Sequence, residues 1–386
     1  MQRRDFLQCA AAGVLLGLVP WHSWAQRQNA PALPRLLILI ELKGGNDGLN
    51  TVVPYHDPLY YQLRPRLAIA ADQVLPLDPY SGLHPALVAL MPLWQANELA
   101  IIQGVGYPKP NLSHFRSIEI WDTASNSTQY LAEGWLSRLF QQHPTPTSYS
   151  ADGVILGSPT LGPLSGGARA IALNNSQQFA HMSQLADDRL AGSSNAALAH
   201  ILKVESDIQH ASLSLEHPGT LHTSFPTSAF GSALATLAQV LAGGAQVAVA
   251  RISLNGFDTH RDQLKTQARL LADFAHSMAA LRTELIAQRR WQDTVVMSYA
   301  EFGRRAHENQ SGGTDHGTAN AHFVLGGQVR GGFYGERPQL DRLDNGNLIS
   351  AVDFRQLYAT AIERWWGYPS SDILGGCYEP LDLLKG

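Results

Sequence analysis

Short, continuous apolar runs alternate along this chain with longer amphipathic stretches. Arg35 to Leu42 (RLLILIEL), Leu99 to Val105, Val247 to Leu254 and Thr294 to Tyr299 are runs of the first kind. Uninterrupted apolar runs of this length are typical of strands that are buried on both faces of a parallel sheet. Further short strands are expected at residues 151–156, 169–173 and 321–325.

The amphipathic stretches predict helices between these strands. The longest extends from Arg261 to Arg290, where apolar residues recur at three- and four-residue steps. Shorter helices are expected at 83–95, from Ser113 through Trp121, at 228–242 and at 353–366, and most of 176–216 is expected to be helical. Strand and helix alternate without a break in composition, which predicts a single α/β domain with three layers, α/β/α, around a mainly parallel central sheet.

The amino-terminal segment does not follow this pattern. It carries arginines at positions 3 and 4, an apolar run from Cys9 to Pro20, and small residues around Ala25. These features predict an export signal of the twin-arginine type, residues 1–25, cleaved after Ala25. A membrane anchor is the alternative, but the apolar run is short for a bilayer span. We therefore expect residues 26–386 to form one periplasmic or secreted domain, delivered by the twin-arginine export machinery, with no stable membrane span after cleavage.

Composition narrows the class of protein. The chain has 28 Lys plus Arg against 32 Asp plus Glu, so it lacks the basic excess of a nucleic-acid-binding protein. Hydrophobic residues make up 45% and charged residues 16%, which is typical of a globular protein. Only Cys377 remains after the predicted cleavage, and the mature protein is therefore expected to lack an intrachain disulfide.

Polar residues follow several of the predicted strands. In a parallel sheet the carboxyl ends of the strands meet at one edge, where ligands bind. A single Asp after a strand is more often a turn or helix cap, so the prediction depends on the whole set. Carboxylates together with imidazoles favour zinc, manganese or iron over calcium. The residues are Asn46 and Asp47, Ser113 and His114, Asp258 and His260, Glu301, and Asp315 and His316.

The segments GGNDGLNTVVPY, SHF, DTH, EFGR and GTDHG occur in this order behind the twin-arginine signal. In this they resemble a widespread exported bacterial family of uncharacterised function. That family is in turn remotely similar to the alkaline phosphatase and sulfatase superfamily. The resemblance implies an alkaline-phosphatase-like α/β/α fold, a site for one or two divalent metal ions, and a Ser, Thr or modified Cys nucleophile.

The resemblance also implies roles for single residues. Ser113 matches the nucleophile and Asp47 a ligand of the second metal, while Asp258, His260 and His316 match the first-metal ligands. Glu301 stands where the superfamily usually has an Asp-His pair. Asp315-His316 has two interpretations. It is either that pair displaced along the chain, or His316 alone is a first-metal ligand and Asp315 is a further acid before it. We prefer the second. Arg304 and Arg116 are candidates for holding an anionic substrate, with an ordinary ion pair as the alternative for each.

Together these patterns predict an exported metal-dependent hydrolase of phosphate or sulfate esters, or of a related anionic substrate. Ser113 would attack the substrate and Arg304 would bind it. The metal ligands would be Asp47, Asp258, His260, Glu301, Asp315 and His316. The alternative is an exported metal-binding or assembly protein that keeps the fold without catalysis.

Overall fold

The computed structural model describes residues 35–173 and 219–385, which lie within one compact unit, Pro34–Gly386. The predicted export signal, the leader up to residue 34 and the expected helical stretch at 176–216 lie outside the described residues. Among the described residues no helix is both long and apolar enough to cross a membrane.

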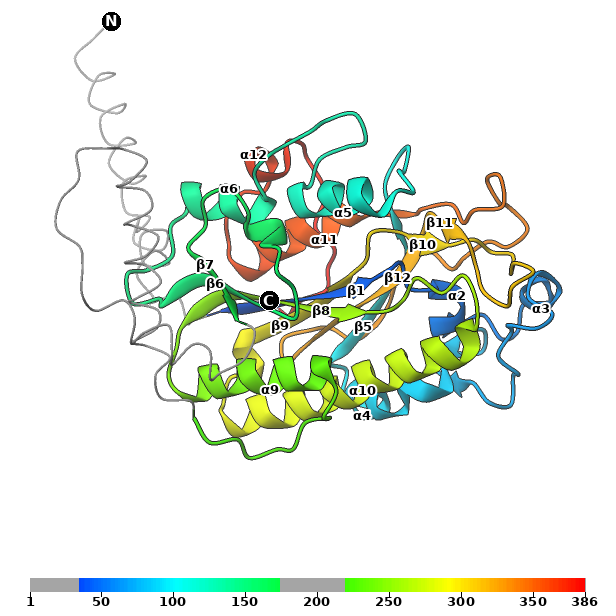
Figure 1. Ribbon diagram of the computed structural model, residues 1–386, viewed down its shortest axis with the longest axis horizontal. Coiled ribbons are helices and arrows are strands. Elements are labelled where there is room, and N and C mark those ends of the chain that lie inside the picture. The colour runs from blue at the N-terminus through cyan, green and yellow to red at the C-terminus, as the bar shows by residue number, and fades with distance from the viewer. Residues whose placement is uncertain (1–34, 174–218, 386) are drawn as a thin grey trace, which may run out of the picture. The chain divides into compact units, whose positions relative to one another are not determined.

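A large sheet forms the centre of this unit (Figure 1). Its strands lie in the order β13-β5-β12-β9-β1-β8-β6-β7, with β14 paired to β5. All of these pairings are parallel except those of β12, which is antiparallel to both β5 and β9. The expected mainly parallel sheet is therefore confirmed. The strands are β1 (Leu36–Lys43), β5 (Leu99–Gly106), β6 (Ala151–Leu156), β7 (Ala170–Leu173), β8 (Val247–Asn255), β9 (Thr294–Tyr299), β12 (Asn320–Gly326), β13 (Gly332–Gly335) and β14 (Val352–Asp353).

Helices cover both faces of the sheet (Figure 1). Because side chains alternate along a strand, Ile38 and Ile40 of β1 enter one hydrophobic core while Leu37 and Leu39 enter the other. The three-layer arrangement is therefore confirmed. The first core lies under α9 (Ala229–Ala242), α10 (Gln263–Ala287), η2 (Pro85–Leu90) and α4 (Met91–Gln95). The second lies under α5 (His114–Thr123), α6 (Trp135–Gln142), α11 (Phe354–Ala359), η5 (Thr360–Trp365) and α12 (Ser371–Leu374).

Two predicted helices are less regular than expected. The stretch expected as one helix at 83–95 is a 3-10 turn followed by a short α-helix, with a proline in the first turn of each segment. Proline has no N–H to donate to the preceding turn, which explains the break. The carboxyl-terminal helix starts with a capping box made by Asp353 and Gln356, and continues as π-helical turns at 360–365.

The remaining elements are short and lie around the edge of the sheet. They are α2 (Gly48–Thr51), β2 (Val52–Val53), α3 (Pro58–Leu63), β3 (Leu75–Pro76), β4 (Gly82–Leu83), η3 (Gly162–Leu164), η4 (Trp291–Asp293), β10 (Gly303–Arg304) and β11 (His316–Gly317).

The central strands change character toward their carboxyl ends. On the face of β1 that carries Leu37 and Leu39, the next two positions are Glu41 and Lys43. Arg251 of β8 is 1% exposed and donates a hydrogen bond of 2.8 Å to Glu41. The apolar part of the sheet therefore ends before the strands do, and a polar edge begins on the α5 side.

Candidate metal centre and the pocket beside it

Three side chains from distant parts of the chain meet at this polar edge. His114 comes from the first turn of α5, Asp258 from the loop after β8, and His316 from β11. One ligand atom from each lies within 4.8 Å of the others, which is close enough for the three to hold a metal ion. A fourth side chain, His260, adjoins this group, because its Nε2 lies 3.1 Å from the Asp258 carboxylate.

Glycine allows the loops that carry these residues to approach one another. Gly44, directly after β1, has φ of 114°, and a Cβ there would lie 2.3 Å from the backbone nitrogen of Asp258. Only glycine takes that conformation easily and leaves room for the neighbouring chain. The first glycine of the GGND segment is therefore required, because it allows the loop after β1 to pack against the loop that carries Asp258.

The three imidazoles share one mode of support. Each places its Nδ1 next to an oxygen acceptor: Glu301 Oε1 at 2.8 Å for His114, Asp315 Oδ1 at 3.4 Å for His260, and the Leu112 carbonyl at 3.0 Å for His316. An acceptor at Nδ1 holds the proton on that nitrogen and leaves the Nε2 lone pair free. Metal-bound histidines in proteins are supported in the same way.

The free Nε2 atoms converge on Asp258. They lie 3.5, 3.1 and 3.2 Å from its carboxylate for His114, His260 and His316 respectively. The Nε2 atoms of His260 and His316 are 3.1 Å apart. With protons on Nδ1, these two nitrogens repel each other unless a cation lies between them. Ligands bound at about 2.0–2.1 Å in a zinc tetrahedron are roughly 3.3 Å apart, so the donor set fits such an ion.

The charges around Asp258 keep its carboxylate ionised. Partial burial alone would raise its pKa, but the hydrogen bond and the positive charge of Arg304 outweigh burial and lower the pKa of Asp258 to about 2. The hydrogen bond to Glu301 raises the pKa of His114, whereas burial lowers the pKa of His316. A carboxylate that stays charged and a histidine that stays neutral are the forms in which both residues bind metals.

Glu301 lies behind His114 and is 2% exposed. Its Oε1 accepts hydrogen bonds from the backbone of Gly44, at 2.9 Å, and from His114, while its Oε2 is buried without a hydrogen-bond partner. Its backbone carbonyl accepts hydrogen bonds from the Ser117 hydroxyl and, at 3.1 Å, from the Trp121 indole. Glu301 therefore fixes α5 as well as the His114 ring.

Asp47 is held apart from this cluster by other partners. Both of its oxygens accept hydrogen bonds from Arg64, at 2.5 and 3.0 Å, and one also accepts from Gln263. It also caps α2 through the backbone of Leu49. Asp47 is 1% exposed and Arg64 is fully buried. Asp47 therefore links the loop after β1 to Arg64 and Gln263. Both of its carboxylate oxygens already accept hydrogen bonds, so neither is free to bind an ion.

Arg304, which the sequence predicts to bind substrate, also has its hydrogen bonds taken up by other parts of the protein. It is 1% exposed and donates to the carbonyls of four loop residues, as well as to Asp258 at 2.8 Å. Arg116 pairs with Glu119 at 2.8 Å and donates to two carbonyls of the following loop. Each guanidinium therefore holds loops in place. The four carbonyls bound by Arg304 belong to Gly44, Gly45, Phe257 and Thr314.

Ser113 is the N-cap residue of α5 and directly precedes His114. It is exposed, and its hydroxyl makes no capping hydrogen bond. His114, by contrast, belongs to the cluster, although the sequence resemblance assigned no metal role to it. The sequence did place His114 next to Ser113 after a predicted strand, which is the signal that could have identified it. Only the structure shows that the His114 ring is directed into the cluster.

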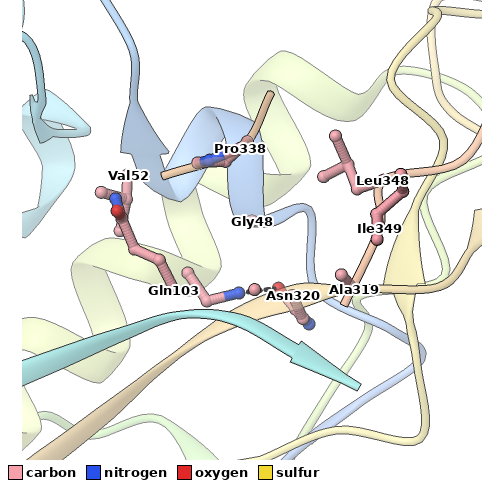
Figure 2. Close-up of a pocket in the computed structure, with 10 residues that line it drawn as sticks. Gly48, Val52, Gln103, Ala319, Asn320, Pro338, Leu348 and Ile349 are labelled. Atoms are coloured by element: carbon pink, nitrogen blue, oxygen red, sulfur yellow. Dashed lines mark hydrogen bonds between the residues drawn. The ribbon is translucent and has the colours of Figure 1, made fainter. Parts of the chain in front are cut away.

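A cavity of about 820 Å³ opens beside the cluster. It shares His114, Asp258 and Glu301 with the cluster and extends along α5. A second cavity, behind α2, measures about 20 Å³ and is lined mainly by apolar side chains and backbone (Figure 2). A space of that size holds no more than a water molecule. Of these two cavities, only the larger one has room for a substrate.

Comparison with known proteins gives one family and several remote structural likenesses. A family described as "Protein of unknown function (DUF1501)" matches residues 94–366. No curated protein matches the chain. The expected resemblance to a family of unknown function is therefore confirmed.

Among solved structures, the periplasmic domain of EptC from Escherichia coli, in complex with Zn, is 11% identical, with a TM-score of 0.39 over 76% of this chain and 72% of that one. The PsFucS1 sulfatase from Pseudoalteromonas sp. is 9% identical, with a TM-score of 0.42 over 90% and 70%. A protein in the alkaline phosphatase superfamily from Vibrio parahaemolyticus is 9% identical, with a TM-score of 0.39 over 90% and 70%.

Proposed function

The chain belongs to the DUF1501 family of unknown function, and for this member we propose metal-dependent hydrolysis of phosphate or sulfate monoesters. The observation that carries the proposal is the convergence of three Nδ1-supported imidazoles on Asp258, beside a cavity large enough for a substrate. Cavities of this size, with a few polar groups at one end, are typical of small-molecule sites.

In this proposal Asp258, His260 and His316 bind one divalent ion, with zinc, manganese or iron suited to the nitrogen and oxygen donors. His114 completes the set, and Glu301 and Asp315 orient the imidazoles through Nδ1. The ion would supply positive charge to an anionic ester. The amino terminus of α5 faces the same place and favours negative charge there. Two ions would require further ligands, of which the unpartnered Glu301 Oε2 is one candidate.

Ser113 is the proposed nucleophile, because it is exposed, its hydroxyl makes no capping hydrogen bond, and it directly precedes His114 in the chain. Its Oγ forms a bond to phosphorus or sulfur while the bond to the alcohol oxygen breaks. The alcohol takes up the proton that the serine loses, and water then hydrolyses the seryl ester and restores the hydroxyl. Lys43 lines the cavity and is exposed, so it replaces Arg304 as the cation that meets the anionic substrate.

Periplasmic or secreted location and twin-arginine export remain part of the proposal, based on the arginines and apolar run at the amino terminus. A folded, metal-loaded protein is the kind of cargo that this route carries.

The test combines metal analysis with turnover. The purified chain is loaded with zinc or manganese, its metal content is measured, and aryl phosphates and aryl sulfates are supplied. We expect bound metal and turnover, with kcat reduced at least 100-fold in Ser113→Ala. His316→Ala should lose the metal. His307→Ala, which removes an exposed histidine from the same loop region, is the matched control and should keep it.

The alternative function is an exported metal-binding protein without catalysis. The observation that favours it is the burial of Arg304, which leaves an anionic substrate without the arginine expected from the sequence. Bound metal without turnover on either ester class, and with no effect of Ser113→Ala, would support this alternative. A chain that binds no metal contradicts both functions.

A further inference from the structure

The cavity beside the metal cluster has one wall made by a single face of α5. Its lining includes helix positions four residues apart, His114, Ile118 and Asp122, together with the residue that follows each of them. Residues at this spacing lie above one another on a helix. With a rise of 1.5 Å per residue, the eight steps from His114 to Asp122 span about 12 Å. The wall therefore leads from the metal cluster to Asp122.

The middle of the cavity is apolar. Ile118, Leu161 from the loop after β6, and Leu131 from the loop after α5 all line this space. Phe115 lies on this lining and is 88% exposed. Such a surface favours an aryl or alkyl body and offers little to a sugar, whose hydroxyls would lose their hydrogen bonds to water.

The far end is polar, and nearly all of it is already paired. Arg251 donates to Glu41 at 2.8 Å, to Tyr299 at 2.7 Å and to the Thr160 carbonyl at 2.8 Å. Asp122 is the exception among these groups, since its Oδ1 is buried without a hydrogen-bond partner. Burial raises the pKa of Asp122 to about 7. A ligand that ended here in a methyl group would cover this carboxyl without pairing it, which is unfavourable.

We propose that the cavity binds the alcohol part of the ester, and that the preferred alcohol has an apolar body ending in a hydrogen-bond donor that Asp122 recognises. This inference rests on the proposed function, since it assumes that the ester group lies at the metal cluster. Asp122 then determines specificity, and it lies about 12 Å along α5 from His114 of the metal cluster.

The test uses two ligands of equal size. 4′-Hydroxybiphenyl-4-yl phosphate and 4′-methylbiphenyl-4-yl phosphate differ only in a hydroxyl and a methyl group at the far end. We expect kcat/KM to favour the hydroxyl ester at least ten-fold, and Asp122→Leu to abolish that preference. Glu119→Gln is the matched control, because it removes a carboxylate one position beyond Ile118 that Arg116 already holds, and it should retain the preference.

Binding of 4-hydroxybiphenyl and of biphenyl is measured on the same proteins by fluorescence titration, because only the first can offer a donor to Asp122 in either orientation. If neither ester is hydrolysed, the proposed function fails while this comparison still decides the inference. Equal affinity for the two biphenyls, or a preference that persists in Asp122→Leu, overturns it.

A second variant covers the case in which Asp122→Leu does not fold. Ile118→Trp fills the middle of the cavity, so the affinity for 4,4′-dihydroxybiphenyl should fall at least ten-fold relative to that for phenol. Unchanged relative affinity would show that the alcohol does not lie along α5, and would likewise overturn the inference.

Discussion

At the level of single residues, two aspartates with the same charge and a similar place after a strand have different roles in this protein. Asp47 and Asp258 both follow a central strand, yet Asp47 is enclosed by Arg64 and Gln263, whereas Asp258 is 46% exposed and faces three imidazoles. What separates them is the set of partners within hydrogen-bond distance. The two aspartates should therefore respond differently to the same substitution.

Asp47→Asn should destabilise the fold and leave the metal content unchanged. The change removes one charge of a buried ion pair with Arg64, and the uncompensated guanidinium is expected to lower the free energy of unfolding by about 3–5 kcal/mol. Urea unfolding measures that loss, and metal analysis of the folded fraction measures retention. Asp258→Asn serves as the comparison: it should lose metal with a smaller loss of stability in the metal-free protein. Metal loss in Asp47→Asn without destabilisation would restore Asp47 as a ligand.

At the scale of elements, the strand next to the parallel core carries a buried histidine. His322 lies in β12, is fully buried, and its Nδ1 is 3.4 Å from the Ser298 hydroxyl while its Nε2 has no hydrogen-bond partner. Burial lowers its pKa to about 3. The His322 ring is therefore neutral in the folded protein, and the stability of the fold depends on pH because protonation of this ring favours the unfolded chain.

The protein should lose stability as the pH falls below about 6.5. The pKa of His322 is 6.5 when unfolded and about 3 when folded, so between these values the unfolded chain binds more protons. Unfolding then becomes easier by roughly 1.4 kcal/mol per pH unit from this group. His322→Phe should flatten the dependence of the free energy of unfolding on pH between 6 and 4, measured by urea titration. An equally steep slope in the variant would assign the acid sensitivity to other groups, such as His84, whose pKa burial lowers to about 4.

At the scale of the whole molecule, the candidate centre joins elements from both halves of the chain. α5 follows β5, Asp258 follows β8, Glu301 follows β9, and His316 belongs to β11. Glu301 and Arg304 hold these segments together, through α5 and through the loop carbonyls respectively. An ion at this place would add a further cross-link between these segments.

Metal binding should therefore raise the stability of the whole domain. Zinc at one hundred times its dissociation constant is expected to add about 2.7 kcal/mol to the free energy of unfolding. Thermal unfolding in buffered zinc, compared with the same protein in a chelator, measures the difference. His260→Ala should reduce the effect and His307→Ala should not. A zinc-independent transition temperature in the unmodified chain would contradict a metal site that links these segments.

Apolar periodicity and turn chemistry are local properties, and they predicted the succession of the main strands and helices along the chain and the polar character of the strand ends. The sequence placed the boundaries of β9 and β6 as the structure has them, and it brought Asp258, His260, Glu301 and His316 into consideration together. Which of the polar side chains meet follows from the folding of the chain in three dimensions. His114 joins the cluster because Glu301 holds its ring, and Arg304 is unavailable to a substrate because loop carbonyls surround it. Asp122 lines a cavity because loops after β6 and β8 lie against α5. These outcomes depend on contacts between residues far apart along the chain, and no local pattern encodes them.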